Sequence, residues 1–266
     1  MISVVNSSYP NKEIIVAADG KISKTGLEIA NKYADLILID KKRLGKAKAC
    51  NRAVEHASGD YILFLDDDTA IERNLIERLL SRFKKGVGAV VPKYLTKNKN
   101  RIITELTNIE ELLLQTSHKV STVLEGTCYG FRGCCFMVSK DVYKQLGGMK
   151  QTLTEDLEFA ARLGKNGYRI VFEPRTTAFT QEYEVLKSWF KHKKRCAKGA
   201  FFVFFNNLDY YLKSPSFFLF ISLPFILALL LFLFISFNFA TVLISVVLLY
   251  SIVSLKEALY LFLFTI

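Results

Sequence analysis

Three short runs of apolar residues in the first quarter of the chain each end in an aspartate. The runs cover residues 14–18, 36–39 and 61–65, and an aspartate follows each of them directly. Helical patterns separate the runs, and apolar strands that alternate with helices predict a parallel α/β sheet. Ligands bind such sheets at the carboxyl ends of the strands. We therefore expect the acidic ends, at Asp19, Asp40 and Asp66, to face one crevice.

The same alternation continues through the charged part of the chain. The spacing of apolar residues predicts one helix that passes through His56 and further helices over residues 26–33, 71–83, 102–120 and 154–164. Shorter apolar runs predict strands over residues 89–92, 134–138 and 168–172, the last of them ending before Pro174.

The end of the chain has a different composition. From residue 214 to residue 255 the sequence contains no charged side chain. Residues 217–239 supply roughly the 20 apolar residues that a helix needs to span a bilayer. Residues 240–266 form a second candidate, which two charged residues interrupt. We therefore predict a transmembrane region over residues 214–266 with one or two spans.

Residues 184–213 are predicted to form an amphipathic helix at the membrane interface. Val185, Trp189, Cys196, Ala200 and Val203 fall on one helical face, and Lys187, Lys191, Lys194 and Lys198 fall on another. An apolar face, a lysine stripe and a tryptophan are typical of a helix that lies on anionic lipid. Because the lysines precede the first span, we expect the globular part on the cytoplasmic side of the membrane.

The composition excludes other classes of protein. Lysine and arginine outnumber aspartate and glutamate by 36 to 25, a net charge of +11. Many lysines lie beside the membrane segment, however, and the chain carries no nucleic-acid-binding motif, so no nucleic acid partner is expected. The five cysteines form no CxxC pair, which favours buried, reduced thiols in a cytosolic domain.

Two carboxylates at the end of the third apolar run are suited to a metal. Asp66 and Asp68 are separated by one residue, and two carboxylates in this arrangement can hold a divalent cation that keeps positions open for phosphate oxygens. The alternative is a cap for the following helix, because aspartate favours that position.

Two further motifs carry a functional and a structural interpretation. Gly45-Lys46 can handle a phosphate or simply begin a solvated basic helix. Thr154-Glu155-Asp156 can supply a general base near a positive helix N-terminus or simply cap that helix.

Taken in order, the motifs resemble those of the family 2 glycosyltransferases. GKAKACN matches the GKxxAxN element of that family, and GDYILFLDDDT matches its strand with a DxD motif. LTEDLEFAARLGKNGYRI is similar to the acceptor-side TED segment, and HKKRCAKG stands where QxxRW is usual. The resemblance implies a Rossmann-like, mostly parallel α/β sheet of the GT-A (nucleotide-diphospho-sugar transferase) type over residues 1–183.

The resemblance also implies a role for each motif residue. Six residues would bind the donor: Asp19, Lys46, Asp66, Asp68, His192 and Arg195. Among them, Asp19 would hold the nucleobase or ribose, and Asp66 and Asp68 would coordinate Mg²⁺ or Mn²⁺ on the diphosphate. Asp156 would accept the proton of the attacking hydroxyl as the catalytic base. Three residues would lie on the acceptor side: Gly126, Arg132 and Glu155.

The sequence departs from the family pattern at three places. The family begins with a nucleotide-cradling strand, whereas Tyr9-Pro10-Asn11 already corresponds to the loop before the second strand, so we expect a catalytic domain truncated at its N-terminus. Ala18 stands where a first aspartate is common. Cys196 replaces the tryptophan of QxxRW, which removes an aromatic wall and disfavours a processive polymerase.

The predicted function is metal-dependent, inverting transfer of a sugar from a UDP- or GDP-sugar to a glycan or lipid-linked acceptor at a membrane. Two alternatives remain open from the sequence. One is a sugar transferase whose acceptor is a polyprenyl phosphate, and the other is a degenerate, non-catalytic membrane protein that binds a nucleotide or partner.

Overall fold

The computed structural model forms two compact units, Met1–Phe217 and Phe218–Ile266. It describes residues 1–216 and nine single positions in the second unit: Leu233, Phe234, Ser236, Asn238, Thr241, Ile244, Ser245, Val247 and Leu248. Among these described residues, no helix is long and apolar enough to cross a membrane. The spans predicted over residues 217–239 and 240–266 lie almost entirely outside the described residues.

A small parallel sheet opens the first unit. Strand β1 (Ile15–Ala18) pairs in parallel with β2 (Leu36–Ile39), and helix α2 (Lys24–Tyr33) connects them. The hydroxyl of Ser23 accepts a hydrogen bond from the Gly26 amide at 3.0 Å, which caps the start of α2. This part of the sequence prediction is confirmed.

The main sheet has five strands in the order β3-β6-β5-β7-β4. Their bounds are β3 Tyr61–Leu65, β4 Ala70–Ile71, β5 Val87–Thr96, β6 Cys135–Ser139 and β7 Arg169–Thr180. Strand β6 runs antiparallel to both β3 and β5, and only β5 and β7 pair in parallel. The expectation of a mostly parallel sheet is therefore wrong, because apolar runs reveal strands but not the direction in which distant strands pair.

Strand β7 also continues past Pro174, where the sequence predicts its end. The register with β5 shifts between Pro92 and Lys93, opposite Glu173 and Thr177. A proline cannot donate to the ladder, and an irregularity of this kind accommodates it. The buried carboxylate of Glu173 is paired there with Arg175 at 2.8 Å, so its charge is compensated.

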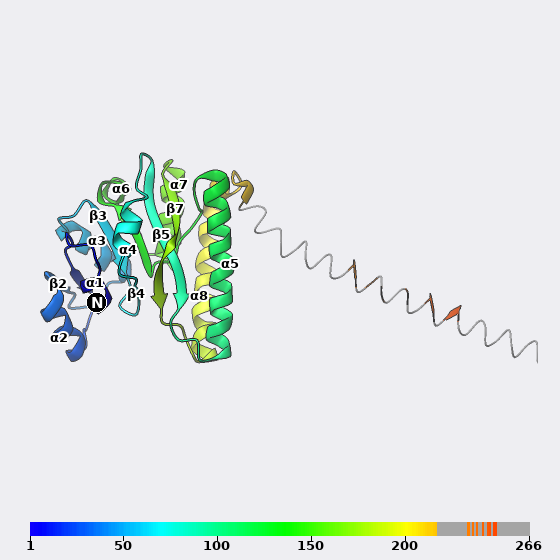
Figure 1. The fold of residues 1–266 in the computed structure, drawn as a ribbon, viewed down its shortest axis with the longest axis horizontal. Coiled ribbons are helices and arrows are strands. Elements are labelled where there is room, and N and C mark those ends of the chain that lie inside the picture. The colour runs from blue at the N-terminus through cyan, green and yellow to red at the C-terminus, as the bar shows by residue number, and fades with distance from the viewer. Residues whose placement is uncertain are drawn as a thin grey trace, which may run out of the picture. The chain divides into compact units, whose positions relative to one another are not determined.

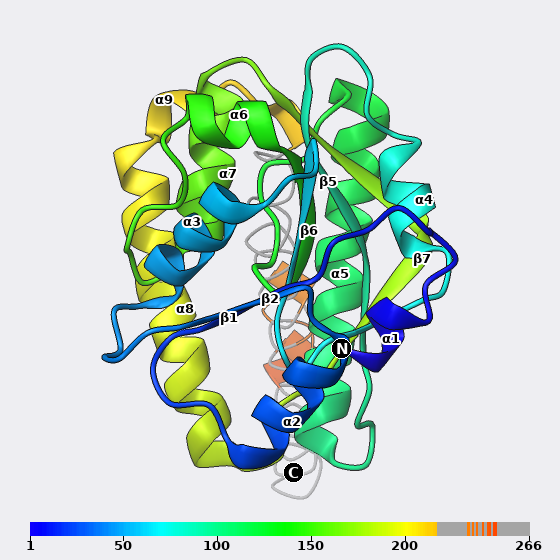
Figure 2. The ribbon, with the colours of Figure 1, turned by 90° about the vertical axis from the view of Figure 1, so that its left-hand side faces the viewer.

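Helices surround the two sheets (Figures 1 and 2). Besides α2, the described helices are α1 Ile2–Val5, α3 Lys46–His56, α4 Leu75–Leu80, α5 Ile102–Glu125, α6 Lys140–Gln145, α7 Glu155–Lys165, α8 Leu186–Asn206 and α9 Leu208–Tyr211. Helix α4 is shorter than predicted, because Ile71 belongs to β4. Helices α5 and α8 touch near their starts, where the Trp189 indole donates to Thr107 at 2.9 Å.

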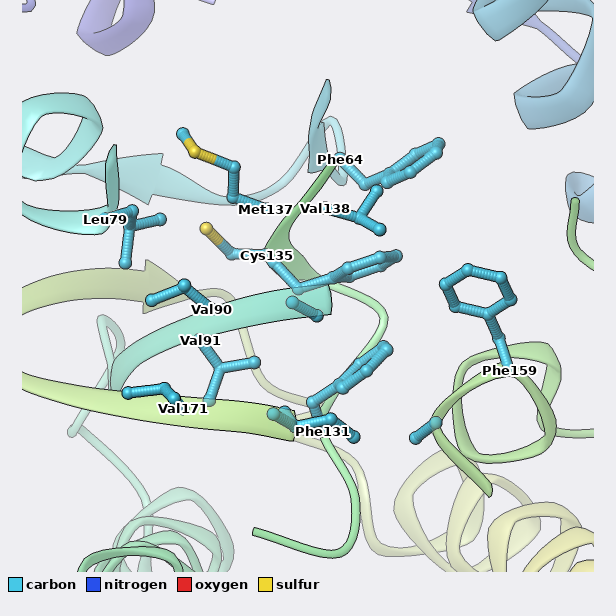
Figure 3. Packing of buried hydrophobic residues seen from close by; sticks show 14 of the residues in the cluster. Phe64, Leu79, Val90, Val91, Phe131, Cys135, Met137, Val138, Phe159 and Val171 are labelled. Atoms are coloured by element: carbon cyan, nitrogen blue, oxygen red, sulfur yellow. The ribbon is translucent and has the colours of Figure 1, made fainter. Parts of the chain in front are cut away.

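The core lies between the main sheet and the helices (Figure 3). Phe136 of β6 is at its centre, with ring centroids 4.8 Å from Phe64 and 4.4 Å from Phe131. All five cysteines are free thiols, and three of them are buried: Cys128, Cys134 and Cys135. These three occupy the core as small apolar side chains, as the sequence predicts.

Candidate active site

Asp19, at the end of β1, organises the loop that begins α3. Its Oδ1 accepts hydrogen bonds from the amides of Leu44 at 2.6 Å and Gly45 at 2.9 Å. Gly45 has a φ of +102°, which favours glycine, and the Gln151 side chain fills the space that a Cβ would need. Burial alone would raise the pKa of Asp19, but the two amides and Arg43 outweigh it and lower that pKa.

The loop places Lys46 against the acidic end of β3. The Lys46 Nζ donates to Asp66 Oδ1 at 2.5 Å and to the Gly133 carbonyl at 3.2 Å. It lies 4.0 Å from a carboxylate oxygen of Glu155. Burial would lower the pKa of Lys46, yet the carboxylates, Asp66 above all, raise it, so the side chain is a cation held among acids.

Asp156 lies in the first turn of α7, on the other side of Gly133. The Gly133 amide donates to Asp156 Oδ2 at 2.6 Å, and the Leu157 amide donates to Oδ1 at 2.9 Å. These two amides fix the position and orientation of the Asp156 carboxylate at the start of α7. A general base needs a carboxylate held in this way, within hydrogen-bond reach of the proton that it takes.

The peptide groups around Gly133 therefore connect the two acidic centres. The Gly133 amide binds Asp156, its carbonyl binds Lys46, and the neighbouring Cys134 carbonyl accepts from the Asp66 amide at 3.0 Å. This arrangement follows from the sheet, because the end of β3 pairs with the start of β6, Leu65 opposite Cys135. The antiparallel β6, which the sequence did not predict as such, thus brings the sites together.

Asp68 is exposed beside Asp66 and fits a divalent cation. Although the side chain is open to solvent, partial desolvation by the protein around its base raises the pKa of Asp68, and so do the nearby charges of Asp66, Asp67 and Glu182. A cation would relieve this crowding of negative charge. Among the described residues no three metal-ligating side chains cluster. Two carboxylates are enough for a metal whose other ligands are phosphate oxygens and water.

Helix α8 closes the site on the side of α7. Gly199 lies directly against Thr154, the residue before α7, and a Cβ at this position would collide with the threonine. Arg195 donates to the Leu153 carbonyl at 2.9 Å. His192 lies 3.4 Å from the Cys196 sulfur, between Nε2 and Sγ. Burial, followed by the charge of Arg195, lowers the pKa of His192.

The face of α8 that the sequence assigns to lipid partly packs on this domain instead. Trp189 bonds Thr107, Val203 is buried, and Cys196 is half-buried beside His192. The motif residues of α8, His192 and Arg195, lie on the same side of the helix as these apolar residues. The side that faces the candidate site therefore packs on the domain.

Comparison with known proteins places the chain in a family. Residues 2–147 match the family described as Glycosyl transferase family 2. The chain belongs to glycosyl transferase family 2. The family resemblance read from the motifs is thereby confirmed.

Two curated relatives of this family 2 chain carry the same name, poly-beta-1,6-N-acetyl-D-glucosamine synthase. The protein from Staphylococcus aureus (strain COL) is 29% identical over 226 residues, covering 82% of this chain and 55% of the relative. The protein from Staphylococcus epidermidis is 30% identical over 204 residues, covering 74% and 50%. The chain therefore spans about half the length of these relatives.

Solved structures show the same fold. A mannosyltransferase from Pyrobaculum calidifontis in complex with GDP-Man and Mn²⁺ superposes with a TM-score of 0.61 at 20% identity, covering 82% of this chain and 61% of that one. GalNAc-T7 with UDP, GalNAc and Mn²⁺ superposes with a TM-score of 0.53 at 14% identity, covering 69% and 40%. The family 2 chain has the GT-A fold, built on a mixed sheet.

Arg132, predicted on the acceptor side, forms a buried ion-pair network. Its guanidinium lies 2.8 Å from Glu111 of α5 and donates to Glu182 at 3.0 Å. Burial would lower the pKa of Arg132, but the surrounding negative groups raise it. The network fixes the residue next to Gly133, and so supports the peptide that connects Asp66 with Asp156.

The structure does not bring every predicted residue to this family 2 site. Gly126 is the C-cap of α5, with a φ of +72°, and lies beside Arg169. Arg169 begins β7 opposite Val87, at the other end of the sheet from the start of β6. Asp40 is paired with Arg52 of α3 at 2.6 Å, so it anchors that helix.

Several residues of the site were missed by the sequence analysis. Glu111 and Glu182 carry no local signal, because their partner Arg132 is distant in sequence from both. Asn51, the last residue of the GKAKACN motif, accepts from Tyr143 at 2.5 Å and from the Met149 amide at 2.9 Å. It fixes the turn that precedes α7, a role that its place in the motif does not reveal.

Proposed function

We propose that this chain transfers a sugar from a nucleotide-diphospho-sugar to an acceptor hydroxyl, with inversion at the anomeric carbon. The acceptor oxygen forms a bond to that carbon, the bond to the diphosphate breaks, and the hydroxyl proton passes to Asp156. The nucleoside diphosphate leaves with the bonding electron pair. One observation carries the proposal: Gly133 joins the Lys46–Asp66 pair to Asp156 through its own amide and carbonyl.

The donor half of the proposal rests on the acidic end of β3 and on Lys46, which is paired with it. Asp66 and Asp68 would hold Mg²⁺ or Mn²⁺, and a bound cation supplies compensation for the charge of the leaving diphosphate. Lys46 would contact the oxygens of the same diphosphate, because its ammonium group is already paired with Asp66. Arg195, which donates to the Leu153 carbonyl, and His192 would border this space from α8. Asp19, which holds the loop before α3, would lie on the nucleotide side.

The acceptor half rests on the start of α7. Asp156 is the base, and Glu155 lies beside it in the same first turn. Burial, followed by the nearby Asp156 charge, raises the pKa of Glu155, which suits a group that contacts a sugar hydroxyl. Arg132 supports the wall between the two halves. Gly126 has no part in the proposed site.

The choice of sugar rests on the names of the relatives, and the choice of acceptor rests on the uncharged end of the chain. The name of the staphylococcal relatives makes N-acetylglucosamine the first sugar to test. We further propose that the enzyme works at a membrane, with its catalytic domain cytoplasmic, since an uncharged run of 42 residues follows the domain. The acceptor is then a glycan end, and a polyprenyl phosphate is the competing choice.

The test is donor turnover by membranes that contain the full chain. We would measure release of nucleoside diphosphate from a panel of UDP- and GDP-sugars, with Mn²⁺ and with a chelator, and with glycan or polyprenyl phosphate as acceptor. Release that requires metal is expected with one donor. The anomeric configuration of the product, opposite to that of the donor, would establish inversion. No release with any pair of substrates would favour the non-catalytic alternative.

Asp156→Asn provides the sharpest variant for this test. We expect it to lower turnover at least a thousandfold and leave donor affinity within about twofold, because the amide keeps the shape but cannot take a proton. Asp68→Ala should lower both the turnover and the affinity for the donor. Asp141→Asn is the matched control, since Asp141 is an exposed acid in the first turn of α6. Near-normal turnover by Asp156→Asn would remove it as the base.

A further inference from the structure

Helix α5 is amphipathic, and its polar side faces inward. Its buried residues are all polar: Thr104, Thr107, Glu111, Gln115 and Ser121. Its exposed residues include seven large apolar side chains on the opposite side: Ile102, Leu106, Ile109, Leu113, Val120, Val123 and Leu124. Ile102 and Val123 are 78% and 76% exposed. A surface helix of a water-soluble domain shows the reverse arrangement.

The inverted orientation is fixed by hydrogen bonds of the buried side. Gln115 donates to the Tyr94 carbonyl of β5 at 2.7 Å, and Glu111 holds Arg132 at 2.8 Å. Thr107 accepts from the Trp189 indole at 2.9 Å, and Ser121 bonds Ser216 at 2.8 Å. Rotating α5 to bury its leucines would break these hydrogen bonds and leave their buried partners unpaired, which is unfavourable.

The outward face of α5 is therefore suited to contact with an apolar environment. A helix of 24 residues is about 36 Å long at 1.5 Å per residue. Removing a large aliphatic side chain from water is favourable, so seven such side chains on one face favour a state in which that face is covered. Contiguous apolar patches beyond a few hundred Å² mark interaction sites on soluble proteins.

Helix α8 extends this surface and adds charge. Figure 1 shows α5 and α8 at the same edge of the first unit, opposite α2. Exposed phenylalanines lie on α8: Phe190, Phe201, Phe202 and Phe205. Exposed lysines lie among them in the sequence: Lys187, Lys191, Lys194 and Lys198. Phenylalanines next to lysines are the composition of a helix that meets anionic headgroups and acyl chains together.

We propose that the outward face of α5 rests in the surface of an anionic lipid bilayer, with α8 beside it. Charge complementarity selects this occupant. Residues 214–255 of the same chain contain no acid that could pair with the lysines of α8. A second copy would bring the same lysines and a further net charge of +11, which opposes association.

The end of α5 supports the same placement. Glu125, in its last turn, accepts a hydrogen bond from the Ser216 amide at 2.8 Å. Ser216 stands in the uncharged run, so α5 is joined to the apolar part of the chain where that part begins. This inference deepens the membrane association proposed above and does not depend on sugar transfer.

The experiment uses tryptophan fluorescence in the full chain. Trp189 is the only tryptophan, so Trp189→Phe gives a silent background for Leu113→Trp and Val123→Trp on α5. Glu28→Trp, on the exposed side of α2, is the control in the same background. Each chain is reconstituted in vesicles of phosphatidylcholine and phosphatidylglycerol, with or without brominated acyl chains, which quench tryptophan on contact.

Brominated lipid should lower the fluorescence of Leu113→Trp and Val123→Trp at least twofold and leave that of Glu28→Trp unchanged. The quenching should weaken in vesicles without phosphatidylglycerol. The proposal would be overturned if brominated lipid left the fluorescence of all three chains unchanged. It would also be overturned if brominated lipid quenched the tryptophan on α2 as strongly as those on α5. Ile109→Trp replaces either α5 variant whose urea unfolding midpoint departs from that of the background chain. Donor turnover is not a readout, so failure here is distinguishable from failure of the proposed activity.

Discussion

At the scale of single residues, the site depends on one glycine. Both hydrogen-bonding groups of Gly133 are used, the amide by Asp156 and the carbonyl by Lys46. A Cβ at this position would lie 3.1 Å from Asp156 Oδ2, which is closer than ordinary contact. A methyl group there must displace the carboxylate by a few tenths of an ångström.

Gly133→Ala should therefore lower kcat about tenfold and leave the donor KM nearly unchanged, because small misplacements of reacting groups cost rate steeply. Steady-state kinetics with the active donor would measure this. Gly59→Ala is the matched control, since a Cβ there meets only the Tyr61 carbonyl oxygen at an ordinary 3.6 Å. A kcat for Gly133→Ala equal to that of the control would mean that the carboxylate position is not critical.

The residues of the site differ in how well the sequence predicts them. Asp66 and Asp156 stand at a strand end and at a helix start, which are local patterns, and the structure places them on either side of Gly133. Glu111 and Glu182 could not be predicted, because a buried acid is recognisable only through its partner, and Arg132 is distant in sequence. Gly126, predicted on the acceptor side together with Arg132 and Glu155, lies at the end of α5 beside Arg169.

At the scale of elements, α5 contains a titratable group that the site does not use. His118 faces Phe172 of β7 with ring centroids 6.0 Å apart, and its Nδ1 is buried without a hydrogen-bond partner among the described residues. Burial lowers the pKa of His118 from 6.5 to about 4. The unfolded chain therefore takes up this proton before the folded chain does as the pH falls.

Stability should then be full above about pH 6.5 and decrease as the pH falls toward 4. Relative to its full value at neutral pH and above, the loss from His118 at pH 5 is roughly 2 kcal/mol, because the slope approaches about 1.4 kcal/mol per pH unit only below pH 6.5. His118→Leu should remove that part of the acid sensitivity in urea unfolding midpoints of the full chain. His56→Leu, at an exposed histidine, should retain the acid sensitivity. Equal dependence of the unfolding midpoint on pH in the two variants would contradict the role given to His118.

The elements themselves were predicted more reliably than their arrangement. The strands at Ile15–Ala18, Leu36–Ile39 and Tyr61–Leu65 follow from continuous apolar runs. The two antiparallel neighbours of β6 do not, because a strand of the same composition can pair in either direction. The spacing of α5 indicated an amphipathic helix, yet which side faces inward is decided by Tyr94, Arg132 and other distant partners.

At the scale of the whole molecule, positive charge is divided between two places. Lys46 and Arg195 lie in the site, whereas the four exposed lysines of α8 project from a helix that carries exposed phenylalanines. Charge near an anionic surface contributes about 1 kcal/mol per lysine. The two sets should therefore be separable by experiment.

Replacing the four α8 lysines, Lys187, Lys191, Lys194 and Lys198, by glutamine should lower the preference of the full chain for anionic over neutral vesicles at least tenfold. Turnover should fall less than twofold. The matched control replaces four exposed lysines elsewhere, Lys21, Lys24, Lys41 and Lys42, with the same change in net charge. If both quadruple variants lose the preference equally, net charge decides it and the position of the lysines does not.

Two of the contacts of helix α8 lie far apart along its length. The indole of Trp189 bonds α5, and Gly199 lies against Thr154 at the start of α7. Gly199 follows Trp189 by ten positions, which is about 15 Å along a helix. One codon added or removed between them would turn the rest of the helix by about 100° and shift it by 1.5 Å. The two contacts thus fix the number of residues between Trp189 and Gly199, whereas many side chains in this stretch can be exchanged.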